Sequence, residues 1–159
     1  MKIQKIYLET TLFNYYFDED RGFAHAGTIK LFTDISAGKY EAYTSRFVID
    51  ELNNAPEAKR EKMLNLISKY DILILETSEE AVRIVNLYIY EKIIPQKYRT
   101  DGLHIAIATV NDLDMIISMN FEHIVKRKTK IGTASINALN GYRIVEIYSP
   151  MEVIENEND

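Results

Sequence analysis

The sequence predicts an α/β fold, a three-layer α/β/α sandwich around a mostly parallel sheet of about five strands. Short apolar segments typical of strands alternate along the chain with segments of helical periodicity, which is the order that βαβ units produce. The 159 residues are about the length of one domain. Only 6 Gly and 3 Pro are present, so long flexible linkers are not expected.

Strands and helices are expected to alternate in the first half of the chain. Segments rich in β-forming residues are 3–8, 40–44 and 71–75. The last of them is almost entirely apolar, which is typical of a strand covered on both faces of a parallel sheet. Helical patterns follow at 21–37, after a possible N-cap at Ser45, and from Pro56 onward.

The second half continues this alternation. Thr77 and Glu80 have the spacing of a capping box for a helix that reaches about residue 90. Thr100 is expected to cap a helix over 101–111. The remaining expected elements are a strand at 115–118, a helix at 132–140 and a last strand at 143–147. No internal repeat or linker interrupts the chain, so we expect one domain over 1–150, followed by an acidic tail at 151–159.

Composition and charge exclude several classes of protein. The absence of Cys excludes disulfides, thiolate metal sites and Cys nucleophiles. The net charge of −5 has the wrong sign for a protein that holds nucleic acid mainly by long-range attraction to phosphate, so a nucleic-acid role would need a local basic patch, a metal ion or a partner. Phosphate-loop, dinucleotide and Gly-x-Ser-x-Gly motifs are absent. No apolar run approaches the roughly 18 residues of a membrane span, so we expect a soluble, cytoplasmic protein.

Polar residues close to the predicted strands form the candidate site, because ligands of open parallel sheets bind outside the carboxyl ends of the strands. Glu9 follows the first strand, and Glu51 lies early in the helix after the second. Asp101 begins the helix before the fourth strand, and Asn120 follows that strand. Three carboxylates and an amide at one edge would repel one another without a cation, and oxygen ligands favour Mg or Mn. Such a site predicts hydrolysis of a phosphodiester by metal-activated water.

Each of these residues also has a plainer interpretation. Glu51 could be a solvated surface acid, and Asp101 could be an early helical acid favoured by the helix dipole. Asn120 could cap the short turn at 121–124. Glu9 is the most informative of the four, because a carboxylate at the end of a core strand is less easily solvated.

Four segments carry a resemblance to a known family: IYLETTLFNYYF, TSRFVIDEL, TDGLHIAIATVNDLDMIIS and MNFEHI. In this order they resemble the PIN-domain family over about residues 3–147, in particular the VapC-like toxin ribonucleases of type II toxin–antitoxin systems. The resemblance implies an α/β/α sandwich and an endoribonuclease, dependent on Mg or Mn, that acts on single-stranded or structured RNA. It also implies a homodimer and a neighbouring antitoxin protein.

The resemblance assigns roles to individual residues. The three acids of the family fall on Glu9, Glu51 and Asp101 as metal ligands, and its fourth acidic position falls near Asn120. Two departures resemble a variant PIN-like subgroup. Glu in place of the usual Asp at position 9 moves the carboxylate by about 1.5 Å, and Asn120 removes a charge, so a metal is expected to bind more weakly.

Other side chains could position water or substrate beside these acids. Hydroxyl groups are offered by Thr10, Thr11 and Ser118. His104 lies about one helical turn after Asp101, where it could orient an acid or the substrate or serve as a hydrogen-bonded structural residue. Basic residues that could contact phosphate, or simply belong to solvated loops, are Arg46, Arg99, Lys126 and Arg127.

Two other classes of function compete with the nuclease. A PIN-fold module without catalysis could serve in RNA binding or protein assembly, and Asn120 favours this alternative. A receiver-like phosphoacceptor would need an acid pair after the first strand and a phosphorylatable Asp after the third. Glu76 follows the third strand here, which argues against a receiver.

Overall fold

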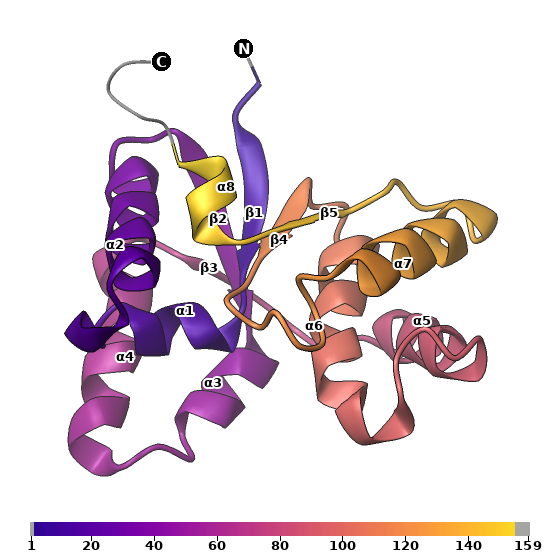
Figure 1. Cartoon of the computed structure of the whole chain (residues 1–159), viewed down its shortest axis with the longest axis horizontal. Helices are drawn as coiled ribbons and strands as arrows, with labels where there is room; N and C mark the ends of the chain where they lie inside the picture. Colours follow the sequence, from indigo (N-terminus) through magenta and orange to yellow (C-terminus); the bar gives the residue numbers. More distant parts are fainter. Residues whose placement is uncertain (1, 155–159) are drawn as a thin grey trace.

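A parallel sheet lies at the centre of the molecule (Figure 1). In residues 2–154, which the computed structural model describes, its strands are β1 (Gln4–Leu8), β2 (Tyr40–Ser45), β3 (Leu73–Leu75), β4 (Met115–Ile117) and β5 (Glu146–Tyr148). Every pair of neighbours is parallel, in the order β3-β2-β1-β4-β5. The expected α/β class, with a parallel sheet of about five strands, is confirmed.

Helices cover the two faces of this sheet and complete the expected three-layer sandwich. The helices are α1 (Thr10–Tyr15), α2 (Phe23–Ser36), α3 (Arg46–Leu52), α4 (Glu57–Lys69), α5 (Glu79–Tyr90), α6 (Arg99–Val110), α7 (Arg127–Leu139) and α8 (Pro150–Val153), with 3₁₀ turns η1 (Glu19–Arg21) and η2 (Gln96–Tyr98). Figure 1 shows α2 and α8 on one side of the sheet and α5, α6 and α7 on the other. In the part of the chain that the structure describes, no helix combines the length and the apolar character needed to cross a membrane.

The core is built around β1 and α6. Ile6, Tyr7 and Leu8 are fully buried because β1 is the central strand and helices cover both faces of the sheet. Helix α6 buries residues all round its circumference, as a helix enclosed by other elements must. Gly102 allows this enclosure, because a Cβ at that position would lie 3.0 Å from side-chain atoms of Ile94 and Val85. The same close packing fixes the first turn of α6.

Two expectations about the segment around β3 are wrong. The strand is not covered on both faces: Leu73 and Ile74 are 50% and 40% exposed, because β3 lies at the edge of the sheet. Thr77 does not cap α5, because the hydroxyl of Ser78 accepts the hydrogen bond from a backbone N–H of the first turn. Glu80, the expected second half of a capping box, instead accepts a hydrogen bond from the hydroxyl of Tyr142.

Other boundaries also differ from the expected ones. Helix α1 was not expected, and α6 begins at Arg99 without a side-chain cap from Thr100. Helix α7 starts at Arg127 rather than 132. Strand β5 starts at Glu146 rather than 143, because its pairing with β4 begins at Glu146, opposite Met115. The N-cap at Ser45 is confirmed by its hydrogen bond from a backbone N–H, 3.1 Å long.

The end of the described chain packs onto the domain. Helix α8 lies at the start of the expected acidic tail 151–159, and its Val153 carbonyl accepts a hydrogen bond of 2.5 Å from the Tyr40 hydroxyl. This contact ties α8 to the amino end of β2. Residues 155–159 of the expected tail lie outside the described residues.

Candidate active site

Glu9 stands at the carboxyl end of β1, as expected, and it is only 4% exposed. Its backbone N–H donates to the carbonyl of Ile117 at 3.1 Å and so extends the β1–β4 pairing by one residue. Its side chain is the N-cap of α1: Oε1 accepts from the backbone N–H and the hydroxyl of Thr11, at 3.2 and 2.5 Å. The hydroxyl of Ser118 donates to the same oxygen at 2.6 Å. Several donors to one carboxylate oxygen are the usual condition under which a carboxylate is buried.

Hydroxyl groups join the ends of β1 and β4 across the sheet. Ser118, which donates to Glu9, also accepts from the backbone N–H of Asn120 at 2.9 Å. The backbone N–H of Met119 donates to the hydroxyl of Thr11, also at 2.9 Å. The expected hydroxyls at 11 and 118 therefore lie at the site, where they hold Glu9 and the turn after β4.

Glu51 reaches the same edge from α3. Its Oε1 accepts from the hydroxyl of Thr10 at 2.6 Å and lies 2.8 Å from Nε2 of His104. Burial alone raises the pKa of Glu51, but the hydrogen bond and charge of His104, together with the hydroxyl of Thr10, hold it below its usual value. Glu51 is therefore an ionised, half-buried acid of this site rather than a solvated one.

Asp101 lies in the first turn of α6, and hydrogen bonds link its surroundings to the other two acids. Asn120 and Ser118 connect it to Glu9, and His104 of the same helix contacts Glu51. Burial is the largest cause of its raised pKa, and the negative charges of Glu9 and Glu51 raise it further, against the opposing effect of His104 and His123. Two other carboxylates are thus close enough to disfavour a third charge. The expected convergence of these three acids on one edge is found.

The contacts of Asn120 differ from those expected of a metal ligand. Its Nδ2 donates to Oδ1 of Asp101 at 3.2 Å, and its own Oδ1 accepts from the backbone N–H of His123 at 3.0 Å. The amide oxygen is therefore used to cap the turn after β4. In this arrangement Asn120 orients Asp101 instead of offering an oxygen to a cation.

A buried hydrogen-bond chain lies behind Glu51. Ser45 is 2.7 Å from the hydroxyl of Tyr7, and that hydroxyl is 2.7 Å from Nδ1 of His104. Nε2 of His104 carries the proton shared with Glu51, since a carboxylate can only accept. Burial raises the pKa of Tyr7 well above its usual value, so its hydroxyl stays protonated. His104, which is 1% exposed, is thus a structural histidine that positions an acid.

The sequence did not point to Tyr7 or Ser45 as part of the site. The sequence predicts Tyr7 as a strand residue and Ser45 as a helix cap, and the structure confirms both positions. The hydroxyls meet only because β1 and β2 are neighbours in the sheet. No spacing pattern in the sequence predicts that contact.

The four basic residues expected near the site divide into two pairs. Arg46 is exposed and directed at Glu76, 3.4 Å away, and Arg99 donates to the side chain of Asn86. Lys126 and Arg127 are exposed at the start of α7, and no ion pair involves them within residues 2–154. Of these four residues, only Arg46 has an acidic partner in the described part of the chain.

The fit of this site to a divalent cation is partial. Three carboxylates gathered at one edge are suitable ligands for Mg²⁺ or Mn²⁺, and a cation would oppose the effect that burial and the charges of Glu9 and Glu51 have on the pKa of Asp101. As the side chains stand, however, no group of three or more His, Asp or Glu residues within residues 2–154 is arranged to hold a metal ion. A cation would compete with Thr10 and His104 for Glu51, and with Thr11 and Ser118 for Glu9.

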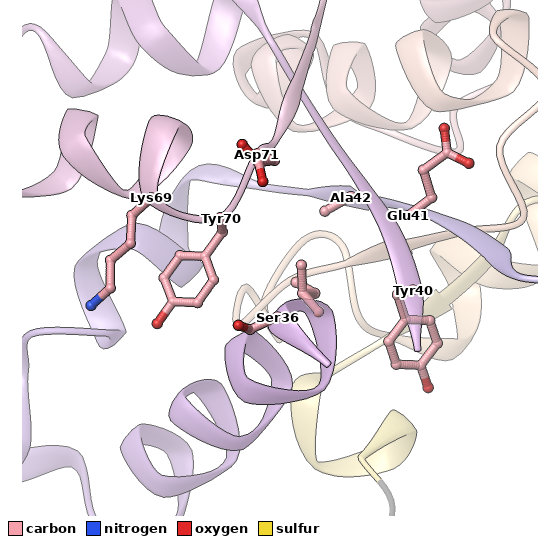
Figure 2. A pocket seen from close by; sticks show the side chains of 8 residues that line it. Ser36, Tyr40, Glu41, Ala42, Lys69, Tyr70 and Asp71 are labelled. Atoms are coloured by element: carbon pink, nitrogen blue, oxygen red, sulfur yellow. The ribbon is translucent and has the colours of Figure 1, made fainter. Parts of the chain in front are cut away.

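A separate hollow of about 240 Å³ lies at the opposite, amino edge of the sheet (Figure 2). It is formed by the end of α2, the start of β2 and the turn before β3, and Tyr40, Glu41, Lys69 and Tyr70 are among its lining residues. Figure 2 shows the charged ends of Lys69 and Glu41 pointing away from each other. None of the acids described above lines this hollow, so it is not part of the candidate site.

Comparison with known proteins does not assign the chain to a family. The chain matches no protein-family model and no curated protein. The likeness to PIN domains rests on the four sequence segments quoted above.

Proposed function

We propose that the protein is a metal-dependent endoribonuclease that uses Mg or Mn to hydrolyse phosphodiester bonds of RNA. The observation that supports the proposal is the convergence of Glu9, Glu51 and Asp101, from three separate segments, on the carboxyl edge of a parallel sheet. Acids buried together in this way are costly, and such a cost is typical of functional sites. The sequence resemblance adds the further proposal of a cytoplasmic toxin that forms a homodimer and is held by an antitoxin.

The proposed roles follow from the contacts of each side chain. Glu9, Glu51 and Asp101 would hold the metal, which when bound would lower the pKa of a water molecule and stabilise charge on the phosphodiester. His104 and Thr10 orient Glu51. Thr11 and Ser118 orient Glu9 in the same way, and Asn120 orients Asp101.

The test is cleavage of a panel of labelled RNAs by the purified full chain, with Mn²⁺ or Mg²⁺ and with a chelator. Asp101→Asn keeps the size of the side chain and its contact with Asn120 but removes the charge. We expect this variant to lose activity by about 100-fold or more. Asp50→Asn is the matched control, because Asp50 is an exposed acid on α3 beside Glu51. Cleavage that resists the chelator, or that survives in Asp101→Asn, would contradict the proposal.

A module without catalysis is the second candidate, and the state of Asn120 favours it. Its amide oxygen is engaged by the backbone of His123, and the oxygens of Glu9 and Glu51 that accept hydrogen bonds are held by hydroxyl groups. Calorimetric titration with Mn²⁺ separates the two candidates. Heat of binding that disappears in Asp101→Asn supports the nuclease, whereas the absence of metal binding together with retained RNA binding supports the module.

A further inference from the structure

A second pocket, of about 110 Å³, is lined in part by His123, which is hydrogen-bonded to Asn120 of the candidate active site. Its apolar floor is the segment 93–95, and its walls include Tyr98, His123, Lys126 and Lys128. The volume corresponds to about four water molecules. A group of the size of a phosphate therefore fits this pocket better than a whole nucleotide does.

The charge of this pocket is opposite to that of the protein. Lys126, Arg127 and Lys128 are consecutive and exposed, and none of them forms an ion pair with an acid of the described residues. The residues that line the pocket include no Asp or Glu. In a chain of net charge −5, these lysines give the pocket a local positive charge, and an exposed acid, Glu122, lies 3.6 Å from Nε2 of His123.

The wall of this pocket that Tyr98 and His123 form is held in place. The rings of Tyr98 and His123 are stacked, with centroids 3.5 Å apart and planes 23° apart. The hydroxyl of Thr129 donates to the carbonyl of His123 at 2.9 Å. A pocket with such a wall is formed before its ligand arrives, which reduces the cost of binding.

The same wall connects the pocket to the active site. The backbone N–H of His123 donates to Asn120, whose amide donates to Asp101, so two hydrogen bonds separate the wall from an acid of the site. His123 is also among the groups that act on the pKa of Asp101. Phe121, which lies in the chain between Asn120 and His123, is 48% exposed and offers a flat surface on which a base can stack.

We propose that this pocket binds a backbone phosphate of the RNA strand, beside the phosphodiester that is cleaved. Lys126 and Lys128 supply the charge, and the strand passes over Phe121 to the acids. The inference rests on the proposed function for the identity of the substrate. It adds to that function a positively charged subsite outside the set of acids.

The test measures RNA binding in the presence of chelator, so that cleavage does not contribute. The probe is a fluorescein-labelled oligouridylate of about ten nucleotides, a length within the site sizes of single-strand-binding folds, and the readout is fluorescence anisotropy. The test variant is the double substitution Lys126→Gln and Lys128→Gln. The control is Lys59→Gln with Lys62→Gln, which removes the same charge from exposed positions of α4.

The expected effect follows from counterion release. Loss of one phosphate contact reduces the slope of log K against log salt by about 0.7 on a single strand, which weakens binding about 8-fold at about 50 mM salt and about 3-fold at about 200 mM. We expect this change in the test variant, whereas the control should bind like the wild-type protein.

Three results would overturn the proposal: no binding of the oligouridylate by the wild-type protein, equal binding by the test variant, or an equal loss in both double variants. Calorimetry with inorganic phosphate tests the alternative source of the anion. Binding of free phosphate without binding of the oligouridylate would likewise rule out the RNA strand as ligand. The cleavage assay stays independent, because a preparation that never cleaves RNA but loses affinity only in the test variant would refute the nuclease and keep the pocket.

Discussion

Replacing Tyr7 by Phe tests the hydrogen-bond chain behind Glu51. The change removes one buried hydroxyl, which lies 2.7 Å from both Ser45 and Nδ1 of His104, and leaves the ring in the core. Each lost hydrogen bond costs about 1 kcal/mol, and a buried ring nitrogen left without a partner costs about 1–3 kcal/mol. Ser45 keeps its bond from the backbone of α3. We therefore expect the free energy of unfolding to fall by about 2–3 kcal/mol.

Tyr43→Phe is the matched control, since Tyr43 is the partner of Tyr7 in the β1–β2 register. Its hydroxyl donates to the exposed side chain of Glu41, so its loss should cost less than about 0.5 kcal/mol. Urea unfolding followed by circular dichroism measures both variants, with a midpoint shift at constant slope expected for Tyr7→Phe. A loss of about 2 kcal/mol corresponds to a fall in Tm of about 4–8 °C at this chain length. Equal small losses in the two variants would refute the chain as a source of stability.

Three further predictions concern α5, α7 and the acids. Ser78→Ala should cost about 1 kcal/mol in urea unfolding, because its hydroxyl caps α5, while Thr77→Ala should change little. Gly132→Ala should lower stability by about 1–3 kcal/mol, because its Cβ would lie 2.6 Å from Cγ2 of Ile93; in the Ile93→Ala background a double-mutant cycle should show a smaller loss. Asp101→Asn should raise the free energy of unfolding at neutral pH, since a raised pKa means that folding disfavours the ionised acid. This gain should be complete above the raised pKa and vanish as the pH falls below the usual value of 3.8, which unfolding curves across that range would show.

Local patterns predicted most of the fold because the dominant elements bury contiguous apolar residues. Residues 105–108 in α6 and the apolar residues of β1 show this pattern in the sequence itself. Helix α1 escaped prediction because its N-cap is Glu9, a residue type outside the usual caps, which is held by a hydroxyl from the far end of β4. The exposure of Leu73 and Ile74 depends on the lateral order of the strands, which short segments do not encode.

The candidate site, like the fold, could be predicted from the sequence only in part. The convergence of Glu9, Glu51 and Asp101 could be predicted because each lies in a segment next to a strand of a parallel sheet, and the carboxyl ends of such strands meet at one edge. The sequence left the role of Asn120 open between metal ligand and cap of the turn. The orientation of its amide group decides between them, and that orientation depends on the contacts with Asp101 and His123. The contact between Tyr7 and His104 joins residues 97 positions apart. Contacts between residues so far apart in the chain depend on how the elements pack, so no periodic pattern in the sequence predicts them.

The central place of β1 has a consequence for how the protein folds as it is synthesised. Strand β2 pairs with one side of β1, but the other side waits for β4, and the bond from Ser118 to Glu9 closes a separation of 109 residues. Contacts so far apart in sequence form slowly. Until about residue 118 has left the ribosome, the nascent chain carries an inner strand that is paired on one side only and an acid without its full set of donors. Arrested chains in which β4 has not yet left the ribosome are therefore expected to bind chaperones, and chains in which β4 has left it are expected to be released.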